Sequence, residues 1–250
     1  MINILFRKIL FFSLLVSALI ATFYSSKLLI GSDAIQSPRS MMDYWACVGN
    51  IGDGGQWHEQ KALVEKALGN APLHAQYWSD YARMYELISF SQNVWNKETK
   101  ENRLNSIKYY RQSAQLRPTW GLAWLNLAQS KVLNQELDKE AFAALRKAYK
   151  YGRWQDDVQR RLLWLSIGLW QSLPEDIKEE TRRIVRNKVQ NDKEMLSMVL
   201  LSLRYSWQKD LRALLTRDDH IAMLDKYEKD RALTKRLLSA SFNKQACTVG

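Results

Sequence analysis

The residue types that could hold a metal or carry acid–base chemistry are few and scattered. The three histidines are His58, His74 and His220, and none has the cysteine or histidine neighbours that a zinc site requires. His58-Glu59 is not followed by a histidine four positions after the first, which excludes the metalloprotease motif and predicts an exposed or capping His58. The sequence therefore predicts no metal ligand and no cofactor-binding residue.

Glycine-rich and acidic segments give no stronger sign of catalysis. Gly52-Asp53-Gly54-Gly55 lacks the Gly-Lys-Ser/Thr ending of a phosphate loop and is expected to form a flexible turn. The pairs Asp156-Asp157 and Asp218-Asp219 stand at expected helix starts, where N-capping explains them. Because a glycosidase needs only two carboxylates, an all-α glycan-cleaving or lytic enzyme remains the alternative. The preferred interpretation is a protein without catalytic residues.

The chain has two cysteines, Cys47 and Cys247, at opposite ends of the part that follows the apolar N-terminal segment. In an oxidising compartment they could form a disulfide, and closing so long a loop contributes roughly 4–5 kcal/mol in the chain-entropy model. The alternative is two unpaired cysteines, one of them packed as a small hydrophobic residue. The sequence leaves both possibilities open.

Composition indicates an all-α fold. The 250 residues include only ten glycines and four prolines, too few for the many tight turns of a β-sandwich. After about residue 55 the commonest residues are strong helix formers such as Ala, Leu, Lys, Arg, Gln and Glu.

An apolar stretch covers Ile9–Phe23 and, with Leu28-Leu29-Ile30, reaches the ~20 residues that a membrane-crossing helix needs. A cleaved signal peptide is the rival interpretation, because the first stretch alone has the right length. Cleavage requires small residues one and three positions before the cut, and after Ala21 the site offers Leu19 instead. An uncleaved anchor over residues 1–30 is favoured.

Orientation follows from the basic residues that flank this segment. Arg7 and Lys8 precede it, and short basic N-terminal tails usually stay in the cytoplasm. The expected location is therefore a single-pass protein of the inner membrane, with its soluble part facing the periplasm of a Gram-negative cell.

The remaining chain divides into three expected parts. Residues 31–39 are polar and predict a linker, residues 40–152 are expected to hold helical repeats, and residues 153–250 form a C-terminal helical region without visible repeats. A less regular stretch is expected around Arg217–His220, and a loose tail at 241–250. Further helices of this region are expected at 155–172, 175–190, 193–205 and 225–239.

An internal repeat supports the middle part. Lys66–Pro72 leads after five residues to Trp78, and Gln112–Pro118 leads after five residues to Trp124, with small residues at matching positions. The proline ends one unit, the indole fills the space between two helices, and small residues let backbones approach closely. The expected repeat core is Ala67, Pro72, Trp78, Ala82, Tyr110, Ser113, Pro118, Trp124 and Ala128.

These positions resemble the tetratricopeptide repeat. Ser106, Tyr110, Ser113 and Pro118 match the second helix of that motif. The two tryptophans are 46 residues apart (124 − 78), more than the roughly 34 of the family, so Ser91–Thr99 is expected to be an insertion. The resemblance implies a solenoid of helical hairpins that binds other proteins.

Basic residues outnumber acidic ones between Lys97 and Arg161. They predict a surface for an acidic partner, such as a phospholipid headgroup, an anionic glycan or an acidic protein segment, although an ordinary solvated face explains them too. Nucleic acid is not expected as a partner. Trp120, Trp154 or Trp207 could face a groove. The candidate basic stripe is Arg146, Lys147, Lys150, Arg153, Arg160 and Arg161.

The layout of the whole chain is similar to that of VpsP-type proteins, which are encoded with exopolysaccharide biosynthesis genes in Gram-negative marine bacteria. The most recognisable segments are residues 41–47 (MMDYWAC) and 117–128 (RPTWGLAWLNLA). The likeness implies a non-catalytic scaffold or adaptor that supports exopolysaccharide biosynthesis or export. Its expected partners are proteins at the inner membrane, such as a polymerase, a ligase or an export component.

Overall fold

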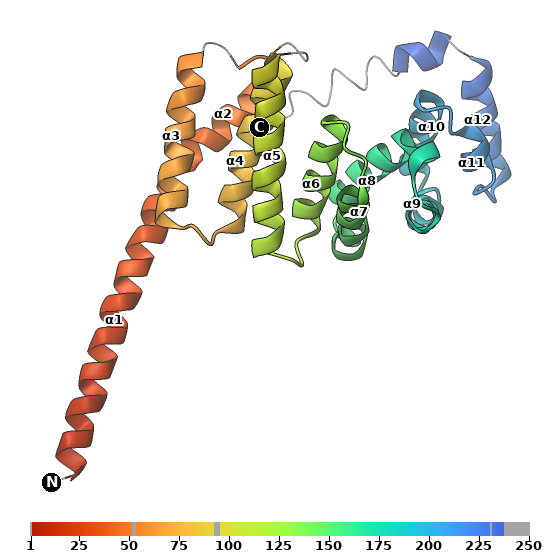
Figure 1. The fold of residues 1–250 in the computed structure, drawn as a ribbon. Coiled ribbons are helices and arrows are strands. Elements are labelled where there is room, and N and C mark those ends of the chain that lie inside the picture. The colour runs from red at the N-terminus through yellow and green to blue at the C-terminus, as the bar shows by residue number, and fades with distance from the viewer. Residues whose placement is uncertain (1, 52–53, 93–95, 231, 238–250) are drawn as a thin grey trace.

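The fold is all-α, as composition predicts. A computed structural model describes residues 2–51, 54–92, 96–230 and 232–237, and in these ranges it contains helices and no strand (Figure 1). The first six helices are α1 (Ile2–Ala34), α2 (Gln36–Val48), α3 (Gly54–Asn70), α4 (Ala75–Ser91), α5 (Lys97–Leu116) and α6 (Gly121–Leu133). They are followed by α7 (Lys139–Gly152), α8 (Asp156–Gly168), the short 3-10 helix η1 (Trp170–Ser172), α9 (Glu175–Lys188), α10 (Asp192–Arg204), α11 (Gln208–Arg212) and α12 (Asp218–Lys229).

Successive helices pack in pairs, and the pairs stack beside one another. α4 packs on α5, α6 on α7 and α8 on α9, while α5 also packs on α6 and α7 on α8. The body is therefore a row of helical hairpins, and α1 projects from one end of it as a long single helix (Figure 1). This arrangement confirms the predicted fold class.

The hairpins continue beyond Gly152, where the sequence showed no further repeat. The first helices of successive hairpins begin at 75, 121, 156 and 192, so their spacing is 46, 35 and 36 residues. The residue before each of these helices donates its amide proton to the carbonyl oxygen three residues earlier. These turn bonds are His74 to Ala71, Trp120 to Arg117, Gln155 to Gly152 and Asn191 to Lys188, each at 3.0 Å. The turn geometry is repeated although the proline and tryptophan are not.

One buried position explains why the helical hairpins continue where the sequence repeat can no longer be recognised. The eighth residue of each of these four helices is completely buried, but only the first two are alanine. The four residues are Ala82, Ala128, Leu163 and Val199. Later hairpins fill the same space with larger side chains, so a motif of small residues cannot detect them.

The polar linker expected at 31–39 is instead helical. α1 continues to Ala34, and α2 begins at Gln36 after the single residue Ile35, whose side chain is 1% exposed. Gly31 lies close to the body, because a Cβ there would be in van der Waals contact, 3.4 Å from the Ala67 carbonyl oxygen and from the Tyr77 ring. The polar composition of this segment led to the wrong prediction, because every third or fourth residue packs into the body.

The C-terminal region also differs in detail from its predicted pattern. The helix expected over 155–172 stops at Gly168 and continues as η1, and α11 was not predicted. The irregular stretch expected near Arg217–His220 is the start of α12. Asp218 and Asp219 lie in its first turn, where their negative charges interact favourably with the helix dipole. The tail expected at 241–250 lies outside the described residues.

The buried side chains form two clusters that meet at one tyrosine. The first joins the end of α1 to α2, α3 and α4, and the second extends from α4 and α5 to α12. Tyr109 of α5 packs against both clusters. The α1 end and the far end of the row are thus linked by continuous apolar packing.

Candidate functional site

The two repeat tryptophans make the same contact in successive hairpins. Trp78 donates its indole Nε1–H to the Pro72 carbonyl oxygen at 2.7 Å, and Trp124 donates to the Pro118 carbonyl oxygen at 2.8 Å. In the third hairpin the Gln159 side-chain amide donates to the Arg153 carbonyl oxygen. Each bond joins the first turn of a helix to the turn before it, six residues back.

The other repeat-core residues lie where helices approach one another. Ala67, Ala82, Ser113 and Ala128 are fully buried, while Pro72 and Pro118 are exposed in the turns between hairpins. The Ser113 hydroxyl donates to the Ala75 carbonyl oxygen at 2.8 Å, which joins α5 to the first residue of α4. These side chains hold the scaffold together and do not line a ligand cavity.

Tyr110 serves a different purpose from its small neighbours. It is 3% exposed and donates its hydroxyl proton to Glu86 Oε2 at 2.6 Å. Burial raises the pKa of the Glu86 carboxyl, although the Tyr110 hydrogen bond and the charges of Arg161 and Arg83 act in the opposite direction.

The candidate basic stripe is divided between different surfaces. Arg146 forms a bidentate ion pair with Asp176, with Nε–Oδ2 at 2.5 Å, so its charge is neutralised. The Lys147 ammonium lies 3.8 Å from the centroid of the Trp124 ring. Arg146, Lys150 and Arg153 line one cavity together with Asp176 and Glu180. Arg160 and Arg161 line a separate groove, in which Asp157 is the single carboxylate.

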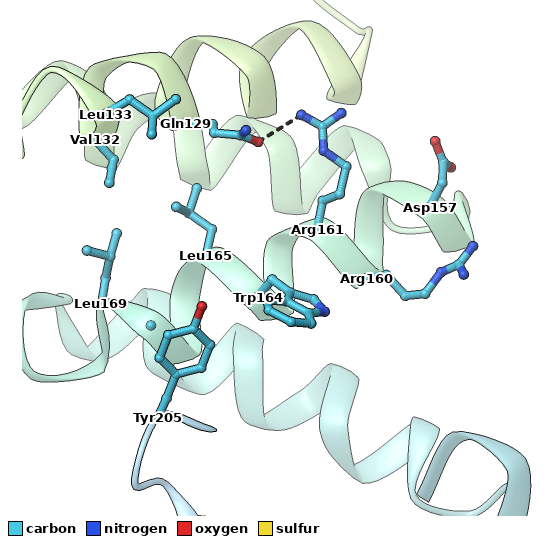
Figure 2. A pocket seen from close by; sticks show the side chains of 11 residues that line it. Gln129, Val132, Leu133, Asp157, Arg160, Arg161, Trp164, Leu165, Leu169 and Tyr205 are labelled. Atoms are coloured by element: carbon cyan, nitrogen blue, oxygen red, sulfur yellow. Dashed lines mark hydrogen bonds between the residues drawn. The ribbon is translucent and has the colours of Figure 1, made fainter. Parts of the chain in front are cut away.

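This groove lies between α6 and α8, and Tyr205, the residue after α10, closes it at one end (Figure 2). Its volume is about 630 Å³, within the range of small-ligand and peptide sites. It is lined by Gln129, Val132, Leu133, Asp157, Arg160, Arg161, Trp164, Leu165, Gly168, Leu169 and Tyr205.

One end of the groove is basic. Arg161 donates to Gln129 Oε1 at 2.8 Å, the bond drawn in Figure 2, and also to Asn126 Oδ1 at 2.7 Å. These neutral amides orient the guanidinium without cancelling its charge. Arg160 is exposed and forms no ion pair in the part of the chain that the structure describes. Asp157 is the single carboxylate of the lining, so this end has a net positive charge.

The other end is apolar and aromatic. The Trp164 and Tyr205 rings meet edge to face with centroids 6.1 Å apart, and the Arg204 guanidinium lies 5.1 Å from the Trp164 centroid. Gly168 makes room for this arrangement, because a Cβ there would lie 3.2 Å from the Tyr205 ring. The groove can therefore bind a segment that carries a carboxylate beside an apolar group, by non-covalent contacts alone.

The histidines and their acidic neighbours are held by protein contacts. His58 is exposed, as predicted, and its ring Nδ1 lies 2.6 Å from the Gly54 carbonyl oxygen. Asp192, Asp219 and His220 could approach a metal ion, with ligand atoms within 4.8 Å of one another. Arg217 already pairs with both carboxylates, at 2.9 and 2.5 Å, so a cation of the chain itself offsets part of their negative charge.

The aromatic residues of the groove were not the ones that sequence reasoning selected. Trp207 is 2% exposed in the core, Trp120 is half-buried and Trp154 lies exposed in a turn. The sequence signal that could have found Trp164 is its position four residues after Arg160, on the same face of one helix. Tyr205 is too distant in sequence for any local pattern to join it to them.

A scan against protein-family models gives no match for this chain, and a search of curated proteins gives none either.

Proposed function

We propose that this chain is a non-catalytic adaptor, anchored by α1 in the inner membrane, that holds a partner protein in the groove between α6 and α8. α1 supports the anchoring, because Phe6 onward is long and apolar enough to cross a bilayer and none of its apolar window is buried in the body. The periplasm is the proposed location of the body, from the basic residues that precede the span.

The observation that carries the proposal is the combination of charge and aromatic surface in one groove. Arg160 offers a cation without an intramolecular ion pair among the described residues, and Trp164 offers an indole about one helical turn away. Tryptophan and arginine are the side chains that contribute most to protein–protein binding. The proposed ligand is an acidic segment, with an apolar side chain close to its carboxylate, on a membrane-associated partner protein.

The biological setting is proposed from the likeness to VpsP-type proteins. In this setting the adaptor positions a polymerase, a ligase or an export component of exopolysaccharide biosynthesis beside the membrane. The tetratricopeptide-like hairpins support this role, because stacked hairpins give extended surfaces for other proteins.

Site-specific photo-cross-linking in membranes tests the proposal. A photo-reactive amino acid at position 160 is expected to give a discrete adduct with one membrane protein, and the same amino acid at the exposed Lys139 is the control position. Adding Trp164→Ala is expected to reduce the adduct at least about tenfold, the effect of losing a hot-spot residue. Exopolysaccharide output should fall in the same variant while the chain remains in the membrane.

Two results would overturn the adaptor proposal. One is an adduct from position 160 that is equally strong with and without the Trp164 indole. The other is hydrolysis of a glycan by the purified full chain, which would establish the enzymatic alternative.

A further inference from the structure

The end of α1 that enters the body fixes where the membrane surface must lie. Exposed apolar side chains run along α1 as far as Ile30, and the next residue, Gly31, is already buried against α3. Ala34 and Ile35 follow at 6% and 1% exposure. No flexible segment therefore separates the span from the hairpins, and the body begins where the apolar surface of α1 stops.

The turns between successive hairpins lie at this same end. A Cβ on Gly31 would be 3.7 Å from the Asn70 Cβ, and Asn70 ends α3 directly before the first turn, 71–74. The α3–α4 and α5–α6 connections lie on the side of the body from which α1 projects (Figure 1).

Contacts between helices show that three of these turns are neighbours. Ser113 near the end of α5 bonds to Ala75, the first residue of α4, which places the turn 117–120 beside the turn 71–74. A Cβ on Gly121 would be 2.4 Å from the Gly152 nitrogen, which places the turn 153–155 beside the turn 117–120. We call these three turns together (71–74, 117–120 and 153–155) the turn edge.

The turn edge carries the two most exposed large hydrophobic side chains of the described residues. Leu73 is 80% exposed and Trp154 is 87% exposed, both more than any large hydrophobic side chain of α1 from Phe6 to Ile30. They occupy the same place in equivalent turns, two residues before α4 and α8 begin at Ala75 and Asp156. Surface that is apolar at repeated positions indicates a contact outside the chain.

Each tryptophan of the turn edge is paired with an arginine. The Arg117 guanidinium lies 5.2 Å from the centroid of the Trp120 ring, and the Arg153 guanidinium lies 5.9 Å from that of Trp154. Neither arginine forms an ion pair with a carboxylate in the described ranges. Indoles prefer the interfacial layer of a bilayer, and nearby basic side chains reach the lipid phosphates.

The opposite edge of the hairpins carries charges that are already paired. The turn between α6 and α7 carries Glu136 and Asp138, with Glu140 in the first turn of α7, and Lys131 and Arg111 pair with these carboxylates. An anionic membrane surface would therefore act mainly on the turn edge, where it would attract the unpaired arginines.

We propose that the turn edge rests on the bilayer that holds α1, with Leu73 and Trp154 in the interfacial layer and Arg117 and Arg153 at lipid phosphates. This inference rests on α1 being a membrane anchor, which is part of the proposed function, but it needs no partner protein. The contact would hold the row of hairpins along the membrane and fix the direction in which the groove opens.

Fluorescence quenching of the full chain in vesicles tests the contact. The full chain is reconstituted in phosphatidylethanolamine–phosphatidylglycerol vesicles with an environment-sensitive fluorescent amino acid at position 73 or 154. Some lipids carry a nitroxide on the upper acyl chain. Quenching is expected to be at least about threefold stronger at these positions than at the control position 139, because only the turn edge reaches the interfacial layer. Both positions are highly exposed, so the substitutions leave the core intact.

A charge reversal separates the contribution of the arginines to the bilayer contact from that of the apolar side chains. Arg117→Glu with Arg153→Glu is expected to reduce quenching at position 154 at least about twofold in anionic vesicles, because lipid phosphates then repel the edge. The matched control, Lys139→Glu, alters a charge at the start of α7 and should leave this quenching unchanged.

Alkaline carbonate extraction distinguishes the two proposals. Equal quenching at 73, 154 and 139 in a chain that resists extraction would overturn the bilayer contact and leave the adaptor intact. If position 154 is not quenched in vesicles but is protected from solvent in native membranes, the bilayer contact is overturned in favour of a contact with a protein. Release of the chain by carbonate would remove the anchor and with it both proposals.

Discussion

The indole of Trp124 and the carbonyl oxygen of Pro118 are 2.8 Å from Nε1 to O across the turn between α5 and α6. The bond ties the first turn of α6 to the preceding turn, and the ring is 8% exposed. The same donor and acceptor positions recur at Trp78 and Pro72. In both hairpins the residue that fills the helix pair also fixes the angle at which the chain enters it.

We expect Trp124→Phe to lower the free energy of unfolding by about 1 kcal/mol, the net value of one hydrogen bond. Trp124→Ala should lower it by about 3–5 kcal/mol, because it also leaves a cavity. Thermal unfolding in detergent, followed by circular dichroism, measures both. Trp154→Phe is the control and should change stability by less than about 0.5 kcal/mol, because that ring is exposed. Equal effects at 124 and 154 would contradict the packing role of Trp124.

We expect Gly121→Ala to destabilise the protein by about 1–3 kcal/mol, since the added Cβ would overlap backbone atoms at the end of α7, the partner helix in the same hairpin. The nearest is the Gly152 nitrogen, 2.4 Å away, and a backbone atom cannot rotate aside as a side chain can. Urea unfolding of the two proteins measures the difference.

The control for this substitution is Gly69→Ala in α3, which has open space around its Cβ position. It should be neutral or stabilising by up to about 1 kcal/mol, because alanine favours the helix. A Gly121→Ala variant as stable as Gly69→Ala would show that the start of α6 and the end of α7 are not in close contact.

The buried ammonium of Lys131 predicts a pH-dependent effect. Lys131 is 2% exposed and lies 2.8–3.0 Å from carboxylate oxygens of Glu136, Asp138 and Glu140. Burial alone would lower the pKa of Lys131, but these hydrogen bonds raise it above its ordinary value. Hydrogen bonding from Arg111, joined by Lys131, lowers the pKa of Glu140 to about 2. The cluster joins the end of α6 to the start of α7.

We expect Lys131→Met to lower the free energy of unfolding at pH 7 by about 2 kcal/mol, less than for a fully buried pair because the carboxylates reach solvent. Because the folded-state pKa of Glu140 is depressed, its stabilising contribution is present above about pH 4.5 and is lost as the pH falls towards 2. The difference between variant and wild type should therefore shrink in acid. Unfolding curves at pH 3 and 7 measure it, and a difference that grows in acid would contradict the role of the cluster.

The possible Cys47–Cys247 disulfide remains a prediction, because Cys47 lies in α2 while Cys247 lies outside the described residues. If the pair forms, a maleimide reagent should label neither cysteine in the denatured, unreduced chain and both after reduction. Reduction should lower the free energy of unfolding by up to roughly 4–5 kcal/mol. Cys47→Ser is the matched control, since reduction should not change its stability. Labelling without prior reduction would show two thiols.

The sequence by itself determined the all-α fold and the apolar N-terminal helix, because both depend on local composition and periodicity. The sequence also marked the two hairpins in which an indole bonds to the entry turn, through Pro72 and Trp78 and through Pro118 and Trp124. The groove could not be predicted in this way. Trp164 and Tyr205 come together only because α8 and the end of α10 pack side by side.

Tertiary packing also decided which polar and apolar residues are buried and which are exposed. The segment 31–39 looks like a linker, yet Ile35 is buried because the body covers it. Leu73 and Trp154 are large apolar residues, yet they are exposed because each follows the end of a helix in a turn that points away from the stacked hairpins. Burial depends on which neighbour covers a side chain, and that neighbour is set by the whole row of helices.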